Sequence, residues 1–101
     1  DCIDIMIWFY ENRDVSGLFN VGTGQARSFK NLTEAVYHSL KREPKIDFIE
    51  TPLHLRDQYQ YFTQASMKKL KSAGYKNTFT TLEDGVQKYV ENFLSTDNPY
   101  R

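Results

Sequence analysis

Apolar residues recur at helical spacing in four stretches of this 101-residue chain, and two shorter stretches mix β-branched and aromatic residues. The first predicted helix covers residues 1–12 and is apolar around most of its circumference, from Ile3 and Ile7 to Met6 and Phe9. A helix that is apolar on most sides is normally buried on most sides. A chain this short can cover one face of it. We therefore expect the chain to be part of a longer polypeptide that covers the other face.

A second helix is predicted over residues 29–41, where apolar residues return every three or four positions. Ser28 is the expected N-cap. Asn31 is a competing start, because Glu34 lies three residues after it, at the capping-box position. Proline disfavours helical geometry in the residue before it, so we expect Glu43 and Pro44 to end this helix.

Two more helices are predicted in the second half of the chain. Ser66 should cap a short helix that ends at Gly74 in a left-handed conformation, with Tyr75 making the accompanying apolar contact. Thr81 should begin the last helix, with Asp84 three residues later. The apolar stripe of this last helix comprises Leu82, Val86, Tyr89 and Phe93, with Val90 beside it.

Short strands are predicted at residues 18–22 and 46–50. The expected order is helix, strand, helix, strand, helix, helix. Two strands alone make a poor sheet, which again indicates a piece of a larger body. The predicted fold class is α/β, mostly helical with two or three short strands, and residues 1–101 form a single portion of a domain.

Composition excludes several classes of partner. Thirteen basic and thirteen acidic residues cancel, so no net field favours nucleic acid or an anionic membrane. No apolar run reaches membrane-spanning length. The single cysteine, Cys2, cannot form an internal disulfide, which fits a reducing cytoplasm. The two histidines, His38 and His54, have no spacing that suggests a metal site.

The stretch at residues 55–65 is polar, rich in aromatic and amide side chains, and free of glycine. Neither helical nor strand periodicity accounts for it. Aromatic rings beside planar amides and the guanidinium of Arg56 suit a small ligand with a flat ring and an anionic part. The alternative is a loop whose tyrosines fill a gap between this chain and a neighbour, and residue chemistry alone favours that alternative.

The glycines Gly22 and Gly24 follow a predicted strand, as in a phosphate-binding loop. The dinucleotide fingerprint needs a third glycine where this chain has Arg27, so a tight turn is the favoured interpretation. No nucleophile and base are paired, and the carboxylates are scattered. His54 could contact a ligand in the aromatic stretch. The residues by themselves therefore define no complete active site.

Three strings nevertheless carry a family resemblance: Phe-Asn-Val-Gly-Thr-Gly at residues 19–24, Tyr-Gln-Tyr-Phe-Thr-Gln-Ala at residues 59–65, and Ala-Gly-Tyr at residues 73–75. The chain resembles the C-terminal part of the ADP-L-glycero-D-manno-heptose 6-epimerases, which are extended short-chain dehydrogenases/reductases of bacterial lipopolysaccharide biosynthesis. The first string is shared widely among extended members, whereas the second narrows the match to the heptose epimerases. Residues 1–12 resemble the helix after that family's Val-x-Asp signature, and residues 79–86 resemble the start of its last helix.

The resemblance implies a cytoplasmic enzyme, expected to be a homo-oligomer, with bound NADP. Such an enzyme oxidises C6 of the heptose to a ketone and returns hydride to the opposite face. In this family the glycine-rich cofactor loop and the Tyr-x-x-x-Lys catalytic pair lie upstream, in the Rossmann domain. The resemblance therefore implies that this chain alone holds no catalytic residue, binds no NADP and performs no epimerisation.

One site residue follows from the resemblance. The tyrosine of the family's Tyr-Gln string contacts the sugar nucleotide, and it falls on Tyr59. Family members often have a basic residue directly before this tyrosine, where this chain has Gln58, and Arg56 is the candidate to replace that cation. Asn20 and Thr23 are interpreted as structural residues of the turn.

Two alternatives remain open at this point. The first is the same portion of another extended sugar-nucleotide enzyme, such as a UDP-hexose 4-epimerase or a dehydratase. The second is a small non-enzymatic α/β interaction module whose apolar first helix docks a partner.

Overall fold

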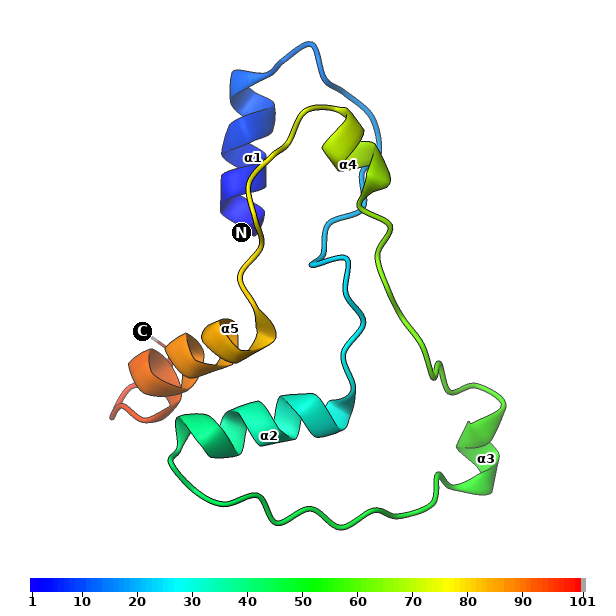
Figure 1. Cartoon of the computed structure of the whole chain (residues 1–101), viewed down its shortest axis with the longest axis vertical. Helices are drawn as coiled ribbons and strands as arrows, with labels where there is room; N and C mark the ends of the chain where they lie inside the picture. Colours follow the sequence, from blue (N-terminus) through cyan, green and yellow to red (C-terminus); the bar gives the residue numbers. More distant parts are fainter. Residues whose placement is uncertain (101) are drawn as a thin grey trace. The chain divides into compact units, whose positions relative to one another are not determined.

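A computed structural model describes residues 1–100, and every regular element in that range is helical (Figure 1). The chain divides into two compact units, one made of Asp1–Ala26 and Gln64–Thr80, the other of Arg27–Thr63 and the chain from Thr81 onward. The elements are α1 (Cys2–Glu11), α2 (Phe29–Ser39), α3 (Leu53–Arg56), α4 (Lys68–Ser72), α5 (Leu82–Tyr89) and the π-helix η1 (Val90–Leu94).

The first unit is built on a small apolar cluster that joins α1 to α4 and to the chain just after α4. Ile5, Met67, Leu70 and Tyr75 are all buried in it. Around them pack the partly buried residues Trp8, Phe9, Phe19, Ala65 and Phe79. The rings of Trp8 and Tyr75 meet edge to face with their centroids 5.6 Å apart, a favourable arrangement for two aromatic side chains.

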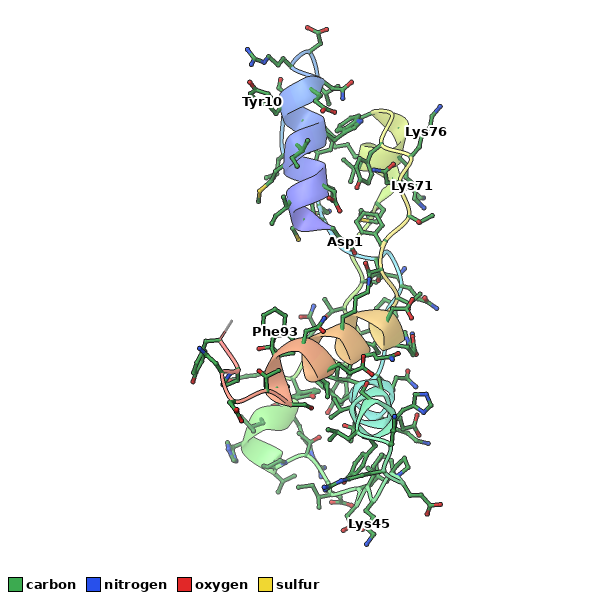
Figure 2. The ribbon with its side chains drawn as sticks, turned by 90° about the vertical axis from the view of Figure 1, so that its left-hand side faces the viewer. Asp1, Tyr10, Lys45, Lys71, Lys76 and Phe93 are labelled. Atoms are coloured by element: carbon green, nitrogen blue, oxygen red, sulfur yellow. The ribbon has the colours of Figure 1, made fainter. Side chains whose placement is uncertain are left out.

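Only one side of α1 takes part in this cluster. Ile5 is 3% exposed, whereas Ile3 and Tyr10 are each 70% exposed and Met6 is 68% exposed. In Figure 2, Tyr10 lies on the side of α1 away from the segment that carries Lys71 and Lys76. The expectation that this chain covers one face of its first helix is therefore confirmed.

The second unit is centred on the packing of α2 against α5 and η1. Ala35 on α2 and Val90 at the start of η1 are its buried residues. A hydrogen bond from Ser95 N to Val90 O, 2.8 Å long, spans five residues and gives η1 its wide turn. The predicted stripe of the last helix is only partly buried, because Tyr89 is 53% exposed and Val90, expected beside the stripe, is its best-buried residue.

Helix starts follow local side-chain chemistry at two of the three predicted caps. Ser28 caps α2: its hydroxyl accepts from Asn31 N at 3.1 Å, and the Asn31 amide oxygen accepts from Ser28 N at 3.2 Å. The competing start at Asn31 is therefore wrong. Thr81 caps α5 as predicted, accepting from Asp84 N at 3.1 Å. The prediction for Ser66 is wrong, because the N-cap of α4 is Met67, one residue later, and no side chain caps this helix.

The end of α4 has the geometry that the sequence predicts. Gly74 has a φ of +112°, a left-handed conformation that glycine adopts without a clash. Tyr75 N donates to Leu70 O at 3.3 Å and Gly74 N donates to Lys71 O at 3.1 Å, which is the Schellman pattern. Tyr75 is buried after it, as expected.

The same motif ends α2, but with a residue that is not glycine. Lys41 has a φ of +53°, with Lys41 N donating to His38 O and Arg42 N donating to Tyr37 O, both at 3.0 Å. The helix thus ends at Ser39, several residues before Pro44 would disfavour helical geometry. The predicted boundary at residues 41–44 came from the proline signal alone and was late by two residues.

The predicted strands are wrong for the described residues, because neither residues 18–22 nor residues 46–50 pair with another strand. A β-strand is stabilised by hydrogen bonds to a neighbour, and an extended segment without one is not a sheet. Both segments keep large apolar side chains in solvent, with Leu18 88% exposed and Ile49 90% exposed. The α/β class is thus not supported within this chain, whereas its mostly helical character is.

Lys41 provides a test of this fold. Lys41→Gly should increase the free energy of unfolding by about 0.5–1 kcal/mol, since glycine removes the Cβ clash at positive φ. Lys41→Ala is the matched control, because it removes the same charge but keeps the Cβ, and it should give no stabilisation. Urea unfolding of the purified chain measures both variants. Equal effects of the two substitutions would show that the charge, and not the backbone conformation, matters here.

Candidate functional site

Tyr59 follows a short helical turn that is held by local hydrogen bonds. The turn α3 begins after Pro52, whose carbonyl accepts from Leu55 N at 2.9 Å. Gln58 N in turn donates to Leu55 O at 3.1 Å. No residue of α3 is buried. Its shape therefore depends on bonds between near neighbours in the sequence and not on a core.

Arg56 adds two longer-range bonds to this turn. Its Nε donates to Thr51 O at 2.9 Å, and its Nη2 lies 3.2 Å from a carboxylate oxygen of Glu50. The Arg56 side chain is 42% exposed and that of Glu50 is 93% exposed, so the ion pair lies in solvent. The guanidinium expected to replace the cation missing at Gln58 is thus bonded within its own segment.

Two tyrosines form the aromatic surface of this segment. The rings of Tyr59 and Tyr61 meet edge to face with centroids 5.2 Å apart. Tyr59 is 42% exposed and Tyr61 71% exposed, and Phe62 after them is also exposed. The residues described here leave these rings open to solvent. They are available either to a flat ligand ring or to a neighbouring protein surface.

The glycine turn at residues 22–24 is filled by protein side chains. A Cβ at Gly22 would lie 3.0 Å from the Cβ of Ala65, and a Cβ at Gly24 would lie 3.1 Å from Cγ of Met67. Thr23 Oγ1 accepts from Gln25 N at 3.2 Å, so it helps to shape the turn as expected. Both glycines are therefore explained by close packing, and the favoured interpretation as a structural turn is supported.

Gln64 ties this turn to the end of the aromatic stretch. Its side-chain oxygen accepts from Ala26 N at 2.9 Å. Residues 22–26 and 64–67, far apart in the sequence, thus run side by side (Figure 1). Two of the three strings that carry the family resemblance therefore meet at this place.

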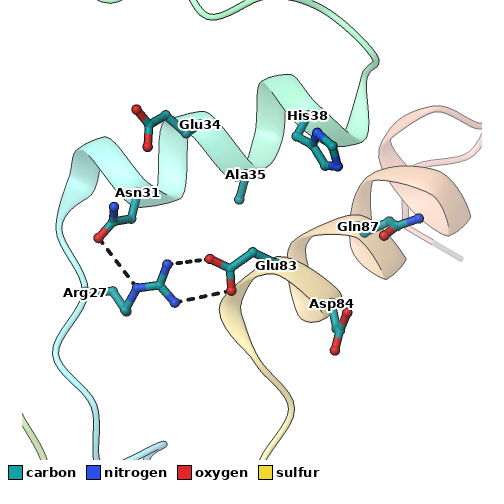
Figure 3. Close-up of a pocket in the computed structure, with 8 residues that line it drawn as sticks. All are labelled: Arg27, Asn31, Glu34, Ala35, His38, Glu83, Asp84 and Gln87. Atoms are coloured by element: carbon teal, nitrogen blue, oxygen red, sulfur yellow. Dashed lines mark hydrogen bonds and ion pairs between the residues drawn. The ribbon is translucent and has the colours of Figure 1, made fainter.

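A concave region lies between α2 and α5, with a volume of about 370 Å³ (Figure 3). An ion pair crosses one end of it, where both terminal nitrogens of Arg27 bond to the carboxylate of Glu83. Arg27 Nε also reaches the Asn31 amide oxygen at 3.5 Å. The lining residues are Arg27, Asn31, Glu34, Ala35, His38, Glu83, Asp84 and Gln87.

The charged side chains in this groove are paired with one another. The hydrogen bonds from Arg27 lower the pKa of Glu83 below its ordinary value of 4.5, and the Glu83 carboxylate raises the pKa of Arg27. Glu34 lies 3.7 Å from Lys30, the usual i,i+4 partner on a helix. Because these charges already have partners, we assign the groove to the packing of the second unit.

The remaining sequence candidates do not assemble into a site. His38 lies exposed at the groove, and His54 lies exposed on α3 and does not line the groove. Cys2 is exposed. Among residues 1–100, no cluster of three or more His, Cys, Asp or Glu side chains is arranged to hold a metal ion. In the same range, no helix has the length and apolar character needed to cross a membrane.

Sequence reasoning missed the two contacts that shape these regions. Arg27 and Glu83 are 56 residues apart, and no local pattern links them. Arg56 and Glu50 are six residues apart, which matches neither helical nor strand neighbours. Gln64, by contrast, lay within a string that the sequence had already singled out.

No protein-family model matches the chain. Curated proteins match it along nearly its whole length. The chain is 47% identical over 100 residues to an ADP-L-glycero-D-manno-heptose-6-epimerase of Nitratidesulfovibrio vulgaris strain DP4, a match that covers 99% of this chain and 31% of that protein. The protein of the same name in strain Hildenborough matches to the same extent. One from Fusobacterium nucleatum is 39% identical over 106 residues, covering 99% of this chain and 32% of that protein.

These matches confirm the resemblance to the heptose 6-epimerases that the motifs at residues 19–24 and 59–65 indicated. The chain spans about a third of the length of these relatives. An alignment of that extent fits a C-terminal part of such a protein.

The Arg27–Glu83 pair makes the second unit sensitive to acid. Because the pKa of Glu83 is lowered in the folded state, the pair stabilises the fold above pH 4.5, and this contribution is lost as the pH falls through the lowered pKa. Glu83→Gln should remove that part of the acid dependence, and the effect should be small since the pair is exposed. Glu43→Gln in the same unit is the control. Thermal melts between pH 7 and pH 3 measure the difference, and parallel curves for the two variants would refute it.

Proposed function

We propose that this chain is the C-terminal, substrate-binding portion of an ADP-L-glycero-D-manno-heptose 6-epimerase of lipopolysaccharide core biosynthesis. The supporting observation is the 47% identity, along nearly the whole chain, to relatives that carry this name. Those relatives are about three times as long as this chain. On this proposal the rest of the enzyme supplies a Rossmann domain with the cofactor loop and the catalytic Tyr-Lys pair.

The proposed reaction uses NADP, which supplies the hydride chemistry at C6 when it is bound. The glycine turn of this chain lacks the dinucleotide fingerprint, because Arg27 stands where the third glycine is needed. The role of this chain is therefore to bind and orient the sugar nucleotide, and NADP belongs to the upstream domain. The enzyme is expected in the cytoplasm as a homo-oligomer.

Tyr59 is the proposed contact to the substrate. Its partly exposed ring has a flat surface for packing on a ring of the ligand, and its phenol can donate a hydrogen bond to a phosphate or a hydroxyl. Tyr61 meets it edge to face and supports its orientation. The turn α3 before it is held by its own hydrogen bonds, so the pair is presented on a preformed segment.

The exposed face of α1 supports the idea of a larger protein. Ile3, Met6 and Tyr10 form an apolar surface on one side of the helix. Apolar surface of this kind is stabilised when it is covered. On this proposal it packs against the part of the enzyme that precedes this chain.

Tyr59→Phe in the complete enzyme should raise the KM for the ADP-heptose by about three- to tenfold, since one hydrogen bond to the substrate is lost. Bound NADP should be unaffected. Tyr61→Phe is the matched control, because it removes a more exposed phenol from the neighbouring ring. Steady-state kinetics and cofactor absorbance measure the two effects. An unchanged KM and kcat for Tyr59→Phe would count against the assignment of this residue.

A thermal shift separates the heptose epimerase from other sugar-nucleotide enzymes. A ligand that binds the folded state raises the melting temperature. ADP-heptose and ADP should therefore stabilise the complete protein more than UDP-glucose or UDP do at equal concentration. Greater stabilisation by the UDP compounds would favour a UDP-hexose epimerase or dehydratase. No shift with any nucleotide would favour a non-enzymatic interaction module.

A further inference from the structure

We propose that Tyr61 is a positioning residue for Tyr59: its ring holds the Tyr59 ring in the orientation that binds the sugar nucleotide. This inference rests on the proposed function, in which Tyr59 contacts the substrate. It deepens that function by making the affinity for the substrate depend on a residue that need not touch the ligand. The group that acts is the aromatic ring of Tyr61 and not its hydroxyl.

Tyr59 lies where the hydrogen bonds of its segment end. The last of these bonds runs from Gln58 N to Leu55 O, 3.1 Å apart. Within residues 1–100, the stretch 59–63 forms no hydrogen bond to any other residue. Tyr59 also lies outside the buried core of its unit. The backbone therefore delivers Tyr59 to its place but does not select one of the staggered rotamers open to its side chain.

The contact that selects the direction of this side chain is the ring of Tyr61. Among residues 1–100, Tyr61 is the only aromatic residue whose ring pairs with that of Tyr59. The ring centroids are 5.2 Å apart and the ring planes meet at 60°. Such an arrangement is attractive, because the positive edge of one ring meets the negative face of the other. The pair thus favours one direction of the Tyr59 ring over the others.

The same geometry leaves room for a ligand. In an edge-to-face pair, each ring keeps at least one face free of the other ring. Tyr59 is 42% exposed, so its ring is not enclosed by the chain. Tyr61 lies beside it and is itself mostly in solvent, at 71% exposed. Tyr61 therefore restricts the Tyr59 ring without blocking it.

Two substitutions of Tyr61 separate its ring from its hydroxyl. Tyr61→Phe keeps the ring contact and removes only the hydroxyl, whereas Tyr61→Ala removes the contact itself. The competing explanation is that Tyr61 packs directly on the ligand. Under that explanation, the loss of affinity in Tyr61→Ala does not depend on Tyr59. A positioning role requires the Tyr59 ring, so the loss disappears when that ring is absent.

The experiment measures KM and kcat for the ADP-heptose in the complete enzyme, as a double-mutant cycle of Tyr59→Ala and Tyr61→Ala. Tyr61→Ala should raise KM about two- to tenfold, the range expected for one aromatic pair, with kcat unchanged. Tyr59→Ala should raise KM at least as much, and adding Tyr61→Ala to it should raise KM no further. Tyr61→Phe should have the KM of the unmodified enzyme. Tyr100→Ala removes an exposed tyrosine from the same unit and is the control that should change neither constant.

The outcomes distinguish this inference from the proposed function. An unchanged KM in Tyr61→Ala, or an equal rise in Tyr61→Ala and Tyr61→Phe, overturns the role of the Tyr61 ring while leaving the epimerase intact. A rise in KM that persists in the Tyr59→Ala background also overturns it, because Tyr61 would then act on the ligand directly. An unchanged KM in Tyr59→Ala overturns both this inference and the assignment of Tyr59. Failure of the unmodified enzyme to convert the ADP-heptose overturns the proposed function as well.

Discussion

The close approach of residues 64–67 to the glycine turn at residues 22–24 is the constraint on which the first unit depends. Ala65 and Met67 occupy the space where side chains on Gly22 and Gly24 would be. Met67 then continues into the buried cluster with Ile5. A larger residue at Gly24 would press on Met67 and push it away from that cluster, and one at Gly22 would press on Ala65. The two strings are therefore complementary, because one leaves a space and the other fills it.

The second unit is held by a different kind of interaction. Ala35 is small enough for α2 and α5 to lie close together, and the ion pair between Arg27 and Glu83 joins the beginnings of the two helices. In Figure 3, this pair lies at one end of the groove between the helices. Its charges are partly in solvent, so it mainly fixes which helix positions face each other. The apolar contact around Val90 at the other end excludes more water.

Local features of this fold were predictable from the sequence, and features that depend on distant partners were not. The Thr81 cap and the Gly74 helix end involve groups within a few residues, and both are present as predicted. The strands failed because a strand needs a neighbour, and the apolar residues of residues 18–22 and 46–50 gave no information about one. Lys41 adopts a conformation that its residue type disfavours, so no sequence rule would have placed it.

The candidate site was predictable to a similar degree. The unusual composition of residues 55–65 marked the segment as a candidate, but the resemblance to the heptose epimerases, and not the composition, singled out Tyr59. The pairing of Arg56 with Glu50 required the structure, because the chain must turn at Pro52 to bring them together. Residue chemistry thus located the segment, while geometry showed which of its groups already have partners.

The wide turn at Val90–Leu94 has a consequence for comparing this helix with its counterparts in other chains. A π-helix arises where a helix accommodates one residue more than regular α-helical bonding would use. A related chain with a single-residue gap opposite η1 would therefore continue as an ordinary α-helix, and its later residues would be rotated by about 100° around the axis. Such a gap would show that the related chain has an α-helix where this chain has a π-helix. The residue that aligns with Val90 would still be buried.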